Sequence, residues 1–341
     1  MTRVAIIGDR FMRASVFAEA LPAGFDCRLH ELAWPDAPFV NACDSGELAG
    51  LKEFMGEPAE IAAVIGDAEI LVTHLAPVSA SILERCPALQ LIGVSRGGPV
   101  NIDIAAARAH GVHVVNAPGR NASAVAEFTI AAILMETRLM RVGHEALRRG
   151  IWRGDLYRAD VTGPELSELT VGIIGYGQIG TRVVKLLKPF GCRILVDDPY
   201  QTLSPQDVAD GVVMTDLAGV LAEADVVSLH ARVTDETRGF LAAPQFHAMK
   251  RGSWFVNTAR GPMVNYDDLL DALESGHLRG AMLETFWQEP PPADHPLLRH
   301  PSVTLTPHIA GASTTTVRIA ASMVAEEIRR WRAGEPFLHS C

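Results

Sequence analysis

The sequence lacks the features that mark membrane-spanning, repetitive or nucleic-acid-binding proteins. No apolar run is long enough to cross a bilayer, and there is no low-complexity tract or repeat of solenoid length. The formal net charge is -10, which disfavours nucleic acid and anionic membrane surfaces as partners. We therefore expect a protein that has neither a membrane nor a nucleic acid as its partner.

Cysteine is also scarce, and the spacing of the cysteines gives no sign of disulfide cross-links. The five cysteines are scattered, and none forms the Cys-x-x-Cys spacing of a zinc or redox site. An odd number at irregular spacing argues against a disulfide framework of the kind found in oxidising compartments. The pattern predicts a cytoplasmic protein with reduced thiols and no bound metal.

The composition itself is that of an ordinary folded protein with two domains. The 341 residues are 48% hydrophobic and 21% charged, which is enough for two full cores. Short apolar runs alternate with segments of helical period, a pattern typical of parallel sheets covered by helices on both faces. The strands expected from these runs are 4–7, 27–32, 70–74, 89–94, 112–115, 171–174, 194–196, 226–230, 253–257, 281–283 and 303–305. The expected helices include 11–21, 79–85, 102–110 and 315–332.

The most informative stretch is a glycine-rich turn within residues 171–180. An apolar run leads into Gly175-x-Gly177-x-x-Gly180, and a helical pattern follows. In such a turn the first glycine permits the tight bend and the second lets the backbone approach a pyrophosphate. The third lets the helix pack close to the strand. Because the N–H groups and dipole of a helix start attract phosphates, the stretch predicts a dinucleotide site.

An acidic residue completes this pattern. Asp198 follows the apolar run 194–196, where a carboxylate can accept hydrogen bonds from the hydroxyls of the adenosine ribose. A carboxylate repels a 2′-phosphate, so NAD(H) is predicted in preference to NADP. Asp197 is the alternative acid, although the alternation of side chains along a strand points it the other way.

A long helix is expected between the two halves of the chain. Apolar residues recur at steps of three and four from Val125 to Val142, and Asn121 or Ser123 can cap the start. Such a helix suits a connection between domains, a subunit interface or an ordinary core-facing position. The pattern alone leaves these three interpretations open.

Three polar side chains each come shortly after an expected strand of the second half, namely Arg260, Glu289 and His308. In open α/β sheets, ligands bind at the carboxyl ends of the strands. A guanidinium can hold a carboxylate and polarise the carbonyl beside it. An imidazolium can supply a proton when a carboxylate keeps it charged and aimed. Together the three side chains suffice for the reduction of a 2-keto acid.

The order and spacing of these segments resemble the D-isomer-specific 2-hydroxyacid dehydrogenase family. The resemblance extends over nearly the whole chain and is strongest over 171–311. Besides the glycine-rich turn, it rests on the segments 225–230, 237–239, 257–261 and 306–311. It implies an NAD-dependent oxidoreductase that transfers a hydride between nicotinamide and a small 2-keto acid or D-2-hydroxy acid, and that assembles as a homodimer.

The same resemblance implies a fold of two doubly wound α/β domains. A Rossmann cofactor domain, 118–308, would be inserted into a flavodoxin-like substrate domain made of 1–117 and 309–341. Arg260 would bind the substrate and polarise its carbonyl, His308 would donate the proton, and Glu289 would pair with that histidine. Residues implied to contact the cofactor are Gly175, Gly177, Gln178, Ile179, Gly180, Asp198, Ala231, Thr258, Ala259, Glu284, His308 and Gly311.

In the first half, the resemblance points to a loop that contains Arg96, Gly97 and Gly98. In relatives the matching loop binds the substrate carboxylate through backbone N–H groups, and glycines after a strand suit such a nest. The alternative interpretation is a tight turn between a strand and a helix. The loop is shorter than is usual in the family, so the identity of the substrate cannot be transferred.

Two further departures from the family pattern concern acidic positions. Glu284 stands where relatives carry an aspartate near the nicotinamide amide, and the extra methylene can shift that contact. Glu289 stands where formate dehydrogenases carry glutamine, which disfavours a formate dehydrogenase. A non-enzymatic alternative is an NAD(H)-sensing binding protein or corepressor on the same fold. Members of that branch keep the catalytic-looking residues, so the motifs alone do not exclude it.

Overall fold

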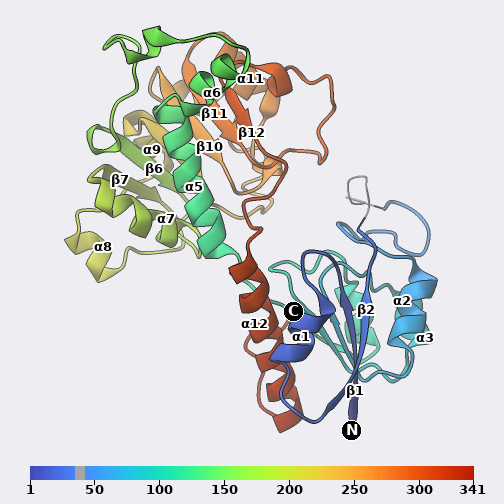
Figure 1. Ribbon diagram of the computed structural model, residues 1–341. Coiled ribbons are helices and arrows are strands. Elements are labelled where there is room, and N and C mark those ends of the chain that lie inside the picture. Colours follow the sequence, from blue (N-terminus) through green and yellow to red (C-terminus); the bar gives the residue numbers. More distant parts are fainter. Residues whose placement is uncertain (35–42) are drawn as a thin grey trace. The chain divides into compact units, whose positions relative to one another are not determined.

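The computed structural model describes residues 1–34 and 43–341, which divide into two compact units (Figure 1). Unit 1 comprises Met1–Asn121 and Ala312–Cys341, and unit 2 comprises Ala122–Gly311. Unit 2 is thus one continuous insertion in the chain of unit 1. Both divisions fall a few residues after the predicted ones, and the assignment of substrate and cofactor roles to the units stays a prediction.

Unit 1 is built around a parallel sheet of five strands in the order β2-β1-β3-β4-β5. Its strands are β1 Thr2–Gly8, β2 Phe25–Glu31, β3 Ile70–Thr73, β4 Leu91–Val94 and β5 His113–Val115. Its helices are α1 Ala14–Ala20, α2 Pro58–Ile65, α3 Ala80–Arg85, α4 Ile104–Ala109 and α12 Thr314–Ala333. The chain winds first to one side of β1 and then to the other, which makes this sheet doubly wound and places its switch point between β1 and β3.

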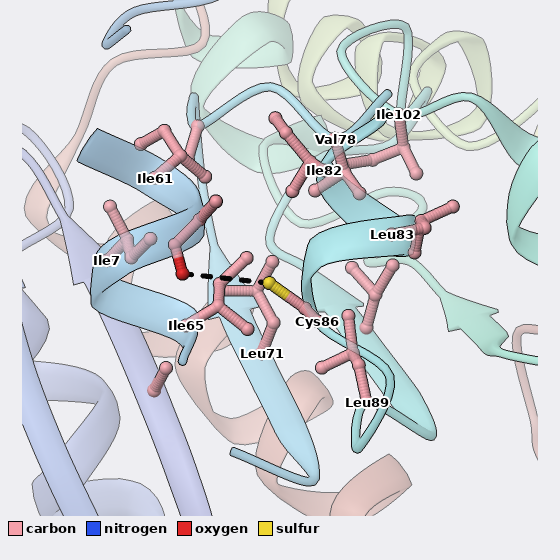
Figure 2. Close-up of a cluster of buried hydrophobic side chains, with 14 of the residues drawn as sticks. Ile7, Ile61, Ile65, Leu71, Val78, Ile82, Leu83, Cys86, Leu89 and Ile102 are labelled. Carbon is pink, nitrogen blue, oxygen red and sulfur yellow. Dashed lines mark hydrogen bonds between the residues drawn. The ribbon is translucent and has the colours of Figure 1, made fainter. Parts of the chain in front are cut away.

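The strands of unit 1 are apolar on both faces because helices cover both. Val4 and Ile6 of β1 lie in the core on the side of α1 and α12, whereas Ile7 lies in the core on the opposite side. Figure 2 shows that opposite core, where Ile7 and Leu71 of the sheet meet apolar side chains of α2 and α3. This continuous hydrophobicity explains why short apolar runs, rather than alternating ones, mark the strands.

The last helix belongs to unit 1 although it is formed by distant sequence. Ser313 caps α12 by accepting a hydrogen bond from the N–H of Thr316 at 3.0 Å. The helix packs on α1 and β4. A Cβ atom on Gly93 would lie 2.7 Å from Cγ1 of Val324, so glycine in β4 allows this close approach.

Unit 2 contains a parallel sheet of seven strands in the order β12-β11-β10-β9-β6-β7-β8. The strands are β6 Thr170–Ile174, β7 Arg193–Asp197, β8 Val213–Met214, β9 Val226–Leu229, β10 Ser253–Asn257, β11 Leu278–Leu283 and β12 Val303–Leu305. The α-helices are α5 Ala122–Thr137, α6 Met140–Arg148, α7 Gly180–Leu187, α8 Pro205–Ala209, α9 Leu217–Glu223, α10 Ala243–Ala248 and α11 Tyr266–Glu274. The switch point of this sheet lies between β6 and β9. Two doubly wound α/β sheets confirm the predicted fold class.

The long helix predicted up to Val142 is in fact two helices. The α5 helix ends at Thr137, and Leu139 adopts a left-handed backbone with φ 55° before α6 begins. A Cβ atom on Gly163 would lie 1.6 Å from the carbonyl oxygen of Thr137, so a later loop packs against this helix end. Apolar periodicity continues across the break, which is why the pattern concealed it. No helix in the described part of the chain is long and apolar enough to cross a membrane.

Candidate active site

The glycine-rich turn joins β6 to α7 at the switch point of the unit 2 sheet. Gly175 has φ 98°, and a Cβ atom on it would lie 2.6 Å from the backbone nitrogen of Ala231. A Cβ atom on Gly180 would lie 2.0 Å from the carbonyl oxygen of Gly175. The first and third glycines are therefore required by the protein's own packing, as the sequence pattern predicts.

The second glycine, Gly177, is not required by packing within the protein. A Cβ atom on Gly177 would meet no protein atom within 4 Å, and Gly177 and Gln178 are exposed. Ile179, partly buried, occupies the N-cap position of α7. The space over Gly177 lies before the first turn of a helix, where N–H groups lack partners within the helix. The turn therefore fits the pyrophosphate of a dinucleotide.

Asp198 follows β7 directly and is partly exposed. One carboxylate oxygen accepts hydrogen bonds from the backbone N–H groups of Tyr200 and Gln201, at 2.8 and 3.1 Å. The other accepts from the N–H of Tyr176 at 2.7 Å, which ties the glycine-rich turn to the end of β7. The pKa of Asp197 is raised by burial and by the Asp198 charge. Asp198 is thus the acid fixed beside the turn.

A histidine–carboxylate pair lies beyond the ends of β11 and β12. Nδ1 of His308 is 2.7 Å from Oε2 of Glu289, and the two side chains are 35% and 27% exposed. Partial burial disfavours the imidazolium, but the hydrogen bond and charge of Glu289, with the charge of Glu284, raise the pKa of His308 above its usual value. The other oxygen of Glu289 accepts the N–H of Phe286 at 3.0 Å, which orients the carboxylate.

Glu284 holds the backbone that carries the histidine. Its side chain is buried and accepts the N–H of Ala310 at 2.9 Å, while its carbonyl accepts the N–H of His308 at 3.0 Å. His308 has a left-handed backbone with φ 53°, a conformation that the surrounding structure must impose. Burial raises the pKa of Glu284 to about 7, against the opposing charge of His308.

Arg260 begins the turn after β10 and is exposed. Its charge opposes protonation of His308, so the guanidinium and the imidazole are electrostatic neighbours. Buried Asn257 shapes this turn by accepting the N–H of Ala259 at 3.0 Å and donating to the carbonyl of Arg260 at 3.3 Å. A Cβ atom on Gly261 would lie 1.8 Å from the carbonyl oxygen of Phe286, so the arginine turn packs against the segment that bears Glu289. The sequence pattern gave Asn257 no role of its own.

The remaining predicted cofactor contacts also lie in unit 2. Thr258 is buried, and its hydroxyl hydrogen-bonds that of Thr129 on α5 at 2.8 Å. Ala259 is buried in the same turn, and Ala231 lies against Gly175 at the end of β9. Gly311 is the last residue of the unit. No cluster of potential metal ligands occurs among the described residues.

Arg96, Gly97 and Gly98 follow β4 in unit 1. The Arg96 guanidinium donates to the carbonyl of Glu53 at 3.0 Å and also binds the Glu53 carboxylate. The carbonyl of Gly97 accepts from the side chain of Asn116 at 2.9 Å, and a Cβ atom on Gly98 would meet nothing within 4 Å. The loop is therefore tied down at Arg96 and open at Gly98.

A parallel sheet with this glycine-rich turn, an acid at the next strand and an acid–base pair defines a dinucleotide-dependent oxidoreductase. The family model described as "D-isomer specific 2-hydroxyacid dehydrogenase, NAD binding domain" matches residues 130–310. The chain belongs to the D-isomer-specific 2-hydroxyacid dehydrogenase family. Because the matching model is that of an NAD-binding domain, the predicted NAD cofactor is confirmed.

Relatives of known activity extend the comparison to most of the chain. Glyoxylate reductase of Thermofilum pendens is 34% identical over 88% of this chain and 89% of its own. Glyoxylate reductase of Korarchaeum cryptofilum is 35% identical over 80% of this chain and 82% of its own. The NAD complex of the formate dehydrogenase from Staphylococcus aureus has a TM-score of 0.75 at 25% identity, covering 98% of this chain and 96% of its own. These similarities support the interpretation of the protein as an oxidoreductase and not as an NAD(H)-sensing binding protein.

Proposed function

We propose that the protein is an NADH-dependent reductase of a small 2-keto acid, and that it catalyses the reverse oxidation of the D-2-hydroxy acid. The observation that carries this proposal is the His308–Glu289 pair, with Arg260 as its electrostatic neighbour. The two glyoxylate reductases among its relatives favour glyoxylate, or a 2-keto acid of similar size, as the substrate. We assign unit 2 to the cofactor and unit 1 to the substrate.

The cofactor would be held by the glycine-rich turn and by Asp198. The space over Gly177 accommodates the pyrophosphate, and Asp198 binds the adenosine ribose. Ala231, Thr258, Ala259 and Gly311 would line the nicotinamide end, with Glu284 near its amide. When bound, NADH supplies the hydride for the keto carbon.

The side chains supply the charge and the proton. Arg260 would bind the substrate carboxylate through its planar guanidinium and polarise the adjacent carbonyl. Because Nδ1 of His308 is engaged by Glu289, the proton for the carbonyl oxygen would come from Nε2. Glu289 stabilises the imidazolium before transfer and fixes its orientation afterwards. In the oxidation direction, neutral His308 accepts the proton at the same atom.

The experiment that tests this function is NADH oxidation with glyoxylate, hydroxypyruvate, 2-ketobutyrate and phosphohydroxypyruvate. We expect turnover of at least one of them, and His308→Ala should lose about 10²- to 10⁴-fold in kcat because a general acid is removed. That variant should still bind NADH. A wild-type protein that binds NADH but turns over no 2-keto acid would overturn the proposal in favour of an NAD(H)-sensing binding protein.

We also propose a homodimer built on α6 and the segment that follows it. Large apolar side chains there are exposed, including Trp152 at 84% and Tyr157 at 95%. Exposed aromatic side chains in one region are typical of a protein interface. In sedimentation experiments the wild type should have twice the mass of the chain and Trp152→Glu should dissociate. Val208→Glu, on α8, is the matched control, because Val208 is also exposed.

The cytoplasm is the compartment that we propose. All five cysteines are free, and Cys341 is exposed, which suits a reducing environment. The net charge of -10 is in keeping with a small-molecule partner rather than nucleic acid or an anionic membrane. Cell fractionation tests the location; recovery with the membrane or secreted fraction would contradict it.

A further inference from the structure

A buried tyrosine contacts the loop that carries Glu289, the partner of the active-site histidine. Tyr266 is the first residue of α11, and it is 4% exposed. Its ring packs against those of Phe286 and Trp287, with centroid distances of 6.3 and 4.8 Å. Phe286 and Trp287 lie between the end of β11 and Glu289. The ring of Tyr266 therefore supports the segment that leads to this carboxylate.

The hydroxyl group of Tyr266 is hydrogen-bonded on two sides. It donates to the carbonyl of Thr285 at 2.6 Å and accepts from the side-chain amide of Asn257 at 3.4 Å. Burial raises the pKa of Tyr266, and the negative charge of Glu289 adds to this effect. The phenol therefore keeps its proton at neutral pH and acts as the donor to Thr285.

The peptide group between Thr285 and Phe286, which we call the bridging peptide, is hydrogen-bonded at both ends. Its carbonyl accepts from Tyr266, and its N–H donates to Oε1 of Glu289 at 3.0 Å. Because a peptide group is planar, a hydrogen bond that orients its C=O also orients its N–H. A donor at the carbonyl also polarises the group and strengthens donation from the N–H. The tyrosine hydroxyl thus acts on the Glu289 carboxylate through one peptide group.

The contacts continue from Glu289 to the imidazole. Its other carboxylate oxygen, Oε2, lies 2.7 Å from Nδ1 of His308. In unit 2, the charges of Glu289 and Glu284 favour the imidazolium, and the charge of Arg260 opposes it. Because Glu289 also hydrogen-bonds the ring, its orientation affects how strongly the ring holds its proton.

The same hydroxyl is also linked to the arginine turn. Asn257, which donates to the hydroxyl, is buried at the end of β10 and also donates to the carbonyl of Arg260 at 3.3 Å. The side-chain oxygen of Asn257 accepts the N–H of Ala259 at 3.0 Å. The turn that bears Arg260 and the loop that bears Glu289 are thus joined through the hydroxyl of Tyr266.

We propose that Tyr266 is a positioning residue for the acid–base step, because its hydroxyl acts through the bridging peptide to aim the Glu289 carboxylate at His308. This inference rests on the proposed function, in which His308 exchanges a proton with the substrate. Tyr266 acts through Glu289 and exchanges no proton itself. Without the hydroxyl, the bridging peptide loses the donor at its carbonyl, and Glu289 holds the imidazolium less firmly.

The test uses Tyr266→Phe, which removes the hydroxyl and keeps the ring. At saturating NADH and neutral pH, kcat/KM for the keto acid should fall about 3- to 10-fold, the effect of one hydrogen bond. The reduction profile should shift to lower pH, because His308 loses its proton more easily. The Kd for NADH should stay that of the wild type. A pH profile that coincides with that of the wild type would show that the inference is wrong.

A double variant tests whether the tyrosine acts through Glu289. In the Glu289→Gln background, Tyr266→Phe should shift the pH profile little further, because the charge that it positions is already gone. If the two shifts simply add, Tyr266 acts independently of Glu289 and the inference fails.

The matched control is Tyr176→Phe. Tyr176 is also 4% exposed, and its hydroxyl also donates a hydrogen bond, in this case to the carboxylate of Asp207. Its removal should leave the midpoint of the reduction profile where it is in the wild type. Equal shifts in the two variants would reflect the loss of any buried hydroxyl and would contradict a specific role for Tyr266.

A direct titration of His308 gives a readout that is independent of turnover. The imidazole signal in the NMR spectrum, assigned by its absence in His308→Ala, should titrate at lower pH in Tyr266→Phe than in the wild type. An unchanged titration would overturn the inference. So would a variant that does not fold at the assay temperature, because the role of Tyr266 would then be structural.

The failure of the inference and that of the proposed function are distinguishable. If the wild type reduces a 2-keto acid but Tyr266→Phe keeps the wild-type pH profile, the inference alone fails. If the wild type turns over no 2-keto acid, the proposed function fails and the inference falls with it.

Discussion

Nδ1 of His308, which follows β12, lies 2.7 Å from Oε2 of Glu289, which lies in the loop that joins β11 to β12. The carboxylate raises the pKa of the imidazole against the effect of partial burial. Buried Glu284 holds the backbone on both sides of the histidine side chain through His308 N–H and Ala310 N–H. One carboxylate thus raises the pKa of the His308 imidazole, and another holds the backbone that carries it.

Replacing Glu289 by glutamine should move the pH dependence of both reaction directions. Reduction needs protonated His308, so its kcat/KM falls as the pH rises through the pKa of His308, whereas oxidation rises through the same pKa. Glu289→Gln keeps the shape but removes the charge that raises this pKa. Its reduction profile should shift to lower pH, with reduction at neutral pH reduced about 10-fold or more. Initial rates from pH 5 to 9 measure the shift, and profiles that do not move would show that the pair does not act in catalysis.

Arginine at position 260 should be irreplaceable by lysine. Arg260→Lys keeps the positive charge but loses the planar fork that holds a carboxylate at two points. We expect kcat/KM for the keto acid to fall about 10- to 100-fold, while the KM for NADH stays near that of the wild type. Near-normal turnover would indicate that the substrate carboxylate is held elsewhere, first of all by the loop at Gly98.

The second and third glycines of the turn should respond differently to the same added methyl group. Gly180→Ala places a Cβ atom 2.0 Å from the Gly175 carbonyl oxygen and should destabilise the fold by about 1–3 kcal/mol. Gly177→Ala meets no protein atom and should leave the melting temperature unchanged, yet weaken NADH binding about 10-fold because the methyl group fills the pyrophosphate space. Calorimetry and NADH titration separate the two effects; unaltered NADH affinity in Gly177→Ala would place the pyrophosphate elsewhere.

The choice between NADH and NADPH should depend on Asp198. Its side chain accepts three backbone hydrogen bonds, so Asp198→Asn is a gentler change than alanine because it keeps an acceptor and loses the charge. The wild type should favour NADH, and the ratio of kcat/KM for NADPH to that for NADH should rise about 10-fold in the variant. Asp197→Asn is the neighbouring control and should change the ratio little. A wild type that uses NADPH equally well would refute the assignment.

The parts of the site that depend on backbone geometry could be predicted from the sequence. Gly175 and Gly180 are required because a Cβ atom would collide with the backbone, and such steric demands leave a fixed spacing in the sequence. Buried parallel strands likewise leave apolar runs, because both of their faces are covered by helices. The dinucleotide site followed from the glycine spacing, the NAD cofactor from Asp198, and the α/β fold from the apolar runs; the NAD-binding family and the fold class are confirmed.

The parts that depend on distant contacts could not be predicted. The break at Leu139 has no glycine or proline to mark it, and α2, at Pro58–Ile65, was not anticipated. In unit 1, His74 contacts both Asp9 and Arg120, at 2.7 and 3.5 Å. The three residues are far apart in sequence, and each alone resembles an ordinary loop residue. Their one shared signal is a position after a strand of a parallel sheet, which gains meaning only when the strand order is known.

The discontinuity of unit 1 has a consequence for how the protein is made. The helix α12, which covers one face of the unit 1 sheet, is synthesised only after all of unit 2. Until then the apolar face formed by Val4, Ile6 and Leu91 is covered by α1 but lacks α12, whereas unit 2 is contiguous in sequence. The nascent chain therefore carries a half-covered sheet until α12 is synthesised. We expect the folding yield to depend on how soon α12 docks after the synthesis of Gly311.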